Sequence, residues 1–91
     1  MLIGVPKEIK THEYRVGLVP ASVREVCHQG HEVIVESRAG AGIGYGDDAY
    51  RAAGADVVAT ADEVFADAEM IVKVKEPQPA ECDKLRVGQI L

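Results

Sequence analysis

Short apolar runs alternate with amphipathic stretches along the whole chain. The apolar runs are rich in β-branched residues and bounded by proline, glycine or charge, which is typical of buried strands. The amphipathic stretches repeat apolar positions at helical spacing. Because the two alternate, the pattern predicts an α/β fold: an open, mainly parallel sheet with right-handed crossovers and flanking helices, Rossmann-like or flavodoxin-like. Strands are expected at 2–5, 31–36, 55–59 and 70–75, a last one begins at 87–91, and helices are expected at 20–29, 47–53, 61–68 and 80–85.

Local signals support the ends of two of these helices. Pro20 suits the first position of a helix, although Val19 before it offers no capping oxygen. Gly30 is the residue type that commonly follows a helix C-terminus. Thr60 and Glu63 have the spacing of a capping box, so they predict the start of the third helix.

Size and charge narrow the classes of function. The chain has 91 residues, is 47% hydrophobic and 27% charged, and carries a net charge of −5. This composition predicts one small globular domain, and the absence of a basic block argues against nucleic acid as a partner. No apolar run has transmembrane length and no signal-peptide pattern precedes the first strand, so we expect no membrane and a cytoplasmic location. Cys27 and Cys82 are far apart and have no metal-binding pattern, so we expect two reduced thiols and no metal.

The end of the sequence is apolar. Residues 87–91 have the composition of a strand that has barely begun and lack a polar finish. Domains usually end in a solvated tail. We therefore expect this sequence to be the front portion of a longer protein.

A glycine-rich loop at 40–46 follows the second predicted strand and superficially resembles a dinucleotide site. Its spacing does not match G-x-G-x-x-G, because Tyr45 and Asp47 stand where a glycine would be needed. Asp47 and Asp48 would also repel a pyrophosphate at the helix that follows. We expect a structural loop with several glycines at positive φ.

Candidate chemistry centres on the stretch Met70–Pro79, in which an apolar strand delivers Lys75 to its carboxyl end. Arg15 follows the first strand, and the carboxyl ends of parallel strands share one edge, where ligands of open α/β sheets bind. A guanidinium suits a carboxylate, and an ammonium suits a carbonyl oxygen on the adjacent carbon. The pair would suit a 2-oxo or 2-amino acid. The alternative for Lys75 is a packed stem with its ammonium in water.

Other polar residues are weaker candidates. Lys73 lies two residues before Lys75 on the same strand face, and we interpret it as a supporting or a solvated residue. Glu76 receives no role. The three histidines, at positions 12, 28 and 31, lie in a loop, near a helix end and at a strand start, and are not expected to be catalytic.

Several short segments form a recognisable pattern when they are taken together and in order: Ile3–Glu8, Glu13–Val16, Gly30–Val33, Ala53–Ala55 and Lys73–Pro77. This pattern resembles the N-terminal region of the alanine dehydrogenases. Related proton-translocating transhydrogenases share the first strand, the arginine and the Ala-Gly-Ala segment, and saccharopine dehydrogenase domains are more distant.

The resemblance implies NAD-linked oxidative deamination of L-alanine to pyruvate and ammonia, and the reverse reaction. It implies that Arg15 binds the substrate carboxylate and that Lys75 contacts the substrate and polarises its carbonyl as a catalytic residue. Residues 1–91 would then form the N-terminal part of the substrate domain, with no cofactor-binding domain. The family further implies a homo-oligomer, a hexamer.

Two parts of the family's machinery lie beyond Leu91: the catalytic histidine and the Rossmann domain that binds NAD. The 91 residues alone are therefore predicted to be inactive. Two alternatives stay open: the corresponding part of a transhydrogenase alpha subunit, and a stand-alone α/β module that binds without chemistry.

Overall fold

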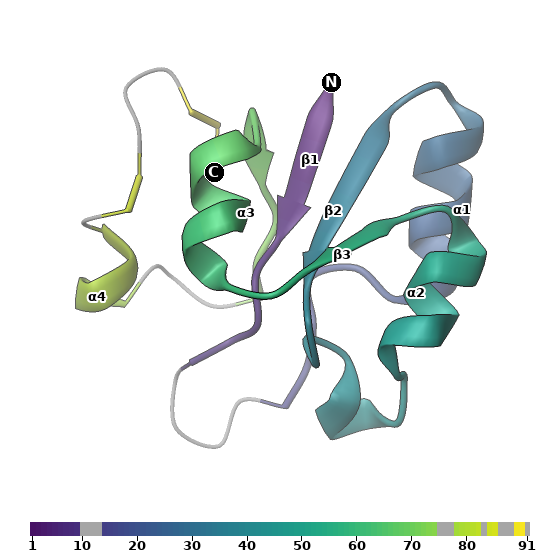
Figure 1. The fold of residues 1–91 in the computed structure, drawn as a ribbon, viewed down its shortest axis with the longest axis horizontal. Helices are drawn as coiled ribbons and strands as arrows, with labels where there is room; N and C mark the ends of the chain where they lie inside the picture. Colours follow the sequence, from purple (N-terminus) through teal and green to yellow (C-terminus); the bar gives the residue numbers. More distant parts are fainter. Residues whose placement is uncertain (10–13, 75–77, 83, 86–88, 91) are drawn as a thin grey trace.

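The computed structural model describes residues 1–9, 14–74, 78–82, 84–85 and 89–90. Its centre is a four-stranded parallel sheet with strand order β3-β2-β1-β4 (Figure 1). The α/β fold predicted from the sequence is thereby confirmed. The strands are β1 (Leu2–Val5), β2 (Glu32–Glu36), β3 (Asp56–Val58) and β4 (Met70–Ile71). The helices are α1 (Pro20–His28), α2 (Asp47–Ala53), α3 (Ala61–Asp67) and α4 (Pro79–Cys82), with a 3-10 turn η1 (Ala41–Ile43).

The direction of the chain across the sheet reverses once. From β1 the chain steps outward through β2 to β3, and it then crosses back to β4 on the other side of β1. Right-handed crossovers therefore place α1 and α2 on one face of the sheet and α3 on the other, as Figure 1 shows. The carboxyl ends of β1 and β4 flank the topological switch point, which is where ligands of such sheets bind.

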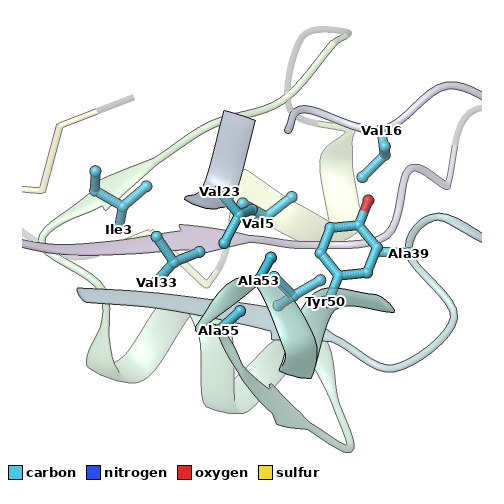
Figure 2. Packing of buried hydrophobic residues seen from close by; sticks show 10 residues of the cluster. Ile3, Val5, Val16, Val23, Val33, Ala39, Tyr50, Ala53 and Ala55 are labelled. Atoms are coloured by element: carbon cyan, nitrogen blue, oxygen red, sulfur yellow. The ribbon is translucent and has the colours of Figure 1, made fainter. Parts of the chain in front are cut away.

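Each face of the sheet has its own apolar core. Alternate residues of β1 and β2 point to the α1 and α2 side, where Tyr50 is 1% exposed (Figure 2). The Tyr50 hydroxyl donates a hydrogen bond of 2.8 Å to the Leu18 carbonyl, and burial raises the pKa of this phenol to about 12. This first core consists of Ile3, Val5, Val16, Val23, Val33, Val35, Ala39, Tyr50, Ala53 and Ala55.

The second core lies between the sheet and α3. It consists of Ile34, Val64, Phe65, Ala68 and Ile71. Gly4 of β1 allows the close approach of α3, since a Cβ there would stand 2.6 Å from the Ala68 Cβ.

The predicted helix ends are also confirmed. Val19 makes no side-chain cap, and Gly30 adopts a φ of 95° just beyond α1. At α3 the Thr60 hydroxyl accepts a 3.3 Å hydrogen bond from the Glu63 amide. These caps agree with the boundaries read from residue type.

Of the strand expected at 87–91, only residues 89–90 are described, and they form one isolated bridge. Ile90 pairs in parallel with Met70, so it extends the sheet beyond β4. The Gln89 side chain donates hydrogen bonds of 2.8 Å to the carbonyls of Phe65 and Ala68. Among the helices described, none is long and apolar enough to cross a membrane.

Two expectations need correction. The lysine strand was expected to reach position 75, but β4 ends at Ile71, and the chain then turns to interact with Glu8. Several glycines of the 40–46 loop were expected at positive φ, but only Gly44 has one. Gly40 is instead required by packing, because a Cβ would stand 2.8 Å from the Tyr50 ring.

Candidate functional site

The segment that carries Arg15 packs against the chain that follows β4. Val16 is buried in the first core and Arg15 beside it is exposed. Gly17 rests on the main chain at Val72, so closely that a Cβ would stand 2.4 Å from the Val72 carbonyl oxygen. The segment after β1 and the segment after β4 are therefore in direct contact, as the shared sheet edge predicted.

Lys75 lies outside the described residues, as do His12, Glu76 and Pro77. The chain that leads to Lys75 is described up to Val74. The Val72 amide donates a hydrogen bond of 3.0 Å to the Gly4 carbonyl, and the Val74 amide donates one of 3.2 Å to Glu8 Oε2. Position 75 thus directly follows main chain that is hydrogen-bonded to β1 and to the loop after it.

Lys73 is the centre of a buried charge cluster that we call the Glu8–Lys73–Glu81 cluster. Its Nζ lies 2.9 Å from Glu8 Oε1 and 3.2 Å from Glu81 Oε2, and the first contact is also a hydrogen bond. The three side chains are between 1% and 3% exposed. The solvated alternative for Lys73 is therefore wrong, because its ammonium is enclosed between two carboxylates.

Glu81 links this cluster to α4. Its Oε1 accepts a 2.9 Å hydrogen bond from the Gln78 amide, while the Glu81 amide donates 2.8 Å to the Gln78 carbonyl. The side chain thus satisfies an amide at the helix start that has no intrahelical partner. Removing one member of a buried ion pair typically costs roughly 3–5 kcal/mol, because the remaining charge is left uncompensated. Loss of Lys73 would leave the carboxylates of Glu8 and Glu81 buried without a counter-charge.

Sequence reasoning found Lys73 and gave it a supporting role as one option, but it missed both carboxylates. Glu8 stands in a charged loop and Glu81 in a short helix, where acidic residues are usually exposed. A signal was available: Glu8 follows β1 and Lys73 follows β4, so both emerge at the same edge of the sheet. Nothing local distinguishes Glu81 from its exposed neighbours.

The glycine loop does not fit a cofactor pyrophosphate. Asp47 lies at the start of α2, and its carboxylate accepts a hydrogen bond of 2.6 Å from the Ser37 hydroxyl and one of 2.8 Å from the Arg38 amide. The hydrogen bond from Ser37 is the main cause that lowers the pKa of Asp47, so this helix start carries a stable negative charge. The residues of this region therefore do not fit the pyrophosphate of NAD.

A hollow of about 390 Å³ opens at the same sheet edge, but at the ends of β2 and β3. Its lining includes Glu36, whose carboxylate accepts a hydrogen bond of 2.8 Å from the Lys7 amide. Burial raises the pKa of Glu36. The wall also holds Lys7 and Arg38, so its charges do not distinguish an acidic from a basic ligand. The lining residues are Lys7, Glu36, Ser37, Arg38 and Ala59.

Metal-binding geometry is absent from the part of the chain that is described: no three His, Cys, Asp or Glu side chains gather there. Both cysteines are free thiols, as expected. Two of the histidines are described, and neither is at the switch point: His28 is in the last turn of α1, and His31 Nδ1 lies 3.4 Å from the terminal amino group.

Comparison with known proteins gives one family. The family model for the alanine dehydrogenase/PNT N-terminal domain matches residues 4–91. Over all 91 residues the chain is 50% identical to an alanine dehydrogenase of Mycolicibacterium smegmatis and 54% identical to one of Methanococcus maripaludis. The chain spans about a quarter of the length of these relatives, 24% in each case.

Solved structures agree with the sequence comparison. An L-alanine dehydrogenase superposes with a TM-score of 0.91 at 53% identity, over 94% of this chain and 24% of that one. A transhydrogenase from Sinorhizobium meliloti superposes with a TM-score of 0.89 at 34% identity, over 97% of this chain and 26% of that one. Both neighbours thus share the fold over nearly the whole chain.

Proposed function

Because the chain belongs to the alanine dehydrogenase/PNT N-terminal domain family, we propose that it forms the first part of the substrate domain of an NAD-linked alanine dehydrogenase. The reaction is L-alanine, NAD and water to pyruvate, ammonia and NADH, and its reverse. The observation that carries the proposal is 50% to 54% identity to alanine dehydrogenases along the entire chain. As in those relatives, three quarters of the enzyme would lie in further sequence.

In this proposal two cations bind the substrate at the switch point. Arg15 binds the substrate carboxylate through the two parallel donors of its guanidinium. Lys75 holds its ammonium at the carbonyl oxygen of pyruvate, where negative charge develops as ammonia or hydride attacks the carbon. The contact between Gly17 and the Val72 carbonyl supports this pairing, since it joins the segment that carries Arg15 to the chain that leads to position 75.

The cofactor and the assembly belong to the same proposal. NAD, when bound, would supply the hydride acceptor, and we propose that it is bound by the part of the enzyme beyond Leu91; the loop at 40–46 does not fit its pyrophosphate. The enzyme acts as a homo-oligomer in the cytoplasm, with small-molecule substrates and no nucleic-acid or membrane partner.

The proposal is tested on the full-length protein that carries this sequence, by following pyruvate-dependent oxidation of NADH. Arg15→Lys keeps the charge but loses the fork, so substrate capture should weaken by about 1.5–3 kcal/mol, seen as a higher KM for pyruvate. Arg24→Lys, an exposed position on α1, is the matched control and should change nothing. An unchanged KM in Arg15→Lys would remove the carboxylate role.

Lys75 is tested by substitution and by its reactivity. Lys75→Ala should abolish turnover, and an acylating reagent should modify Lys75 less when pyruvate is bound. The control is Lys84, which pairs with exposed Asp62 at 2.9 Å and should be labelled equally with and without pyruvate. Lys73 is not a suitable control, because its ammonium is buried. Labelling of Lys75 that pyruvate does not change would restore the alternative of a solvated strand-end lysine.

A transhydrogenase alpha subunit is the second candidate, favoured by the Sinorhizobium meliloti neighbour at 34% identity. The two are separated by the sequence that follows position 91: a membrane-anchored continuation would indicate the transhydrogenase. A chain that folds and binds alone as a stable monomer would instead indicate the non-catalytic module.

A further inference from the structure

The Glu8–Lys73–Glu81 cluster joins three segments that meet at the switch point. Glu8 comes from the loop after β1, Lys73 from the chain after β4, and Glu81 from α4. Each contact is short and shielded, since the three side chains are at most 3% exposed. The cluster is therefore a fixed junction at the base of the candidate site, distinct from the two cations proposed to touch the substrate.

The carboxylates also hold the main chain on both sides of residues 75–77. Glu8 Oε2 accepts the Val74 amide at 3.2 Å, and Glu81 Oε1 accepts the Gln78 amide at 2.9 Å. Val74 is the last described residue before position 75 and Gln78 is the first after position 77. One ammonium, that of Lys73, bridges the two carboxylates and so couples the two anchors.

We propose that Lys73, through Glu8 and Glu81, is a positioning residue that fixes the main-chain amides of Val74 and Gln78, which flank positions 75–77. This inference rests on the proposed function. A buried ammonium between two carboxylates is a costly way to fill space, since an apolar group of similar volume often stabilises a fold as well or better. The geometry gives the charges a use: they hold two main-chain amides at fixed points on either side of a short segment.

The test uses the full-length protein and compares kcat with KM. Lys73→Met keeps the length of the stem and removes the charge, and Lys84→Met is the control, at a half-buried lysine that pairs with the exposed Asp62. If the cluster fixes the main chain at Val74 and Gln78 for substrate binding, Lys73→Met should raise KM for pyruvate by about tenfold or more and lower kcat, because misplacement by about 1 Å can cost 10²-fold. KM for NADH should stay unchanged, since the cofactor is bound elsewhere.

A purely structural role gives a different pattern. Lys73→Met would then lower kcat only in proportion to the folded fraction, leaving KM for pyruvate as in the wild type, and this result would overturn the proposal. Should Lys73→Met fail to fold, Glu8→Gln decides by the same criterion, with a smaller rise of about threefold, because glutamine keeps an acceptor for the Val74 amide. A wild-type protein that does not turn over pyruvate overturns the proposed function and this inference together.

Discussion

Gly17, in the segment that carries Arg15, packs against the main chain at Val72, and Gly17→Ala probes that contact directly. The added Cβ would stand 2.4 Å from the Val72 carbonyl oxygen, 2.8 Å from its carbon and 3.2 Å from the Lys73 nitrogen. All three are main-chain atoms, so no side chain can rotate away. Restoring an ordinary contact near 3.4 Å requires the two segments to separate by about 1 Å.

That separation sets the size of the expected effect. Overpacking usually costs about 1–3 kcal/mol, and we expect the upper end because both partners are backbone. The displaced segments carry Arg15 on one side and lead to Lys75 on the other. A shift of about 1 Å should therefore lower kcat/KM for pyruvate by about 10²-fold even where the protein is folded.

The assay is urea unfolding and steady-state kinetics of the full-length protein, with Gly46→Ala as the matched control. A Cβ at Gly46 meets nothing within 4 Å, and its φ of −81° suits alanine. Since Gly46 is the residue before α2, the control should lose no more than about 1 kcal/mol and keep its kinetics. Equal stability and equal kcat/KM in the two variants would refute the close contact and the convergence argued from it.

Two further predictions concern stability. Arg38 is the one non-glycine residue with a positive φ (69°) in the described part of the chain, so Arg38→Gly should stabilise the folded protein by up to about 1 kcal/mol. Arg51→Gly inside α2 should instead destabilise it by about 1 kcal/mol. Thermal unfolding of both variants tests these opposite signs. Burial raises the pKa of Glu36 above 4.5, so the folded state binds a proton more readily than the unfolded state. The free energy of unfolding should therefore rise as the pH falls from neutral through that raised pKa toward 4.5. Glu36→Gln should remove this rise in pH-dependent unfolding curves, and a pH profile identical to that of the wild type would contradict the assignment.

The layout of the sheet was determined by the sequence, because its signals are local. The apolar period, the turn residues and the caps are properties of a few adjacent residues, so strands at 2–5 and 31–36 and the cap at Thr60 could be predicted, and the structure has them at 2–5, 32–36 and Thr60. The shared edge for Arg15 and the chain leading to Lys75 followed as well. Parallel strands joined by right-handed crossovers leave little freedom about which ends meet.

What only the tertiary structure decided are the contacts between residues far apart in the chain. Lys73 and Glu8 are 65 positions apart, and no local pattern distinguishes a lysine enclosed between carboxylates from one that reaches water. The end of β4 at Ile71 was missed for the same reason, since the chain leaves the sheet to give the Lys73 ammonium and the Val74 amide to Glu8. Gly17 reads as ordinary until the Val72 carbonyl is placed against it. Desolvation and close packing depend on which surfaces meet, and that is settled only when the segments assemble in three dimensions.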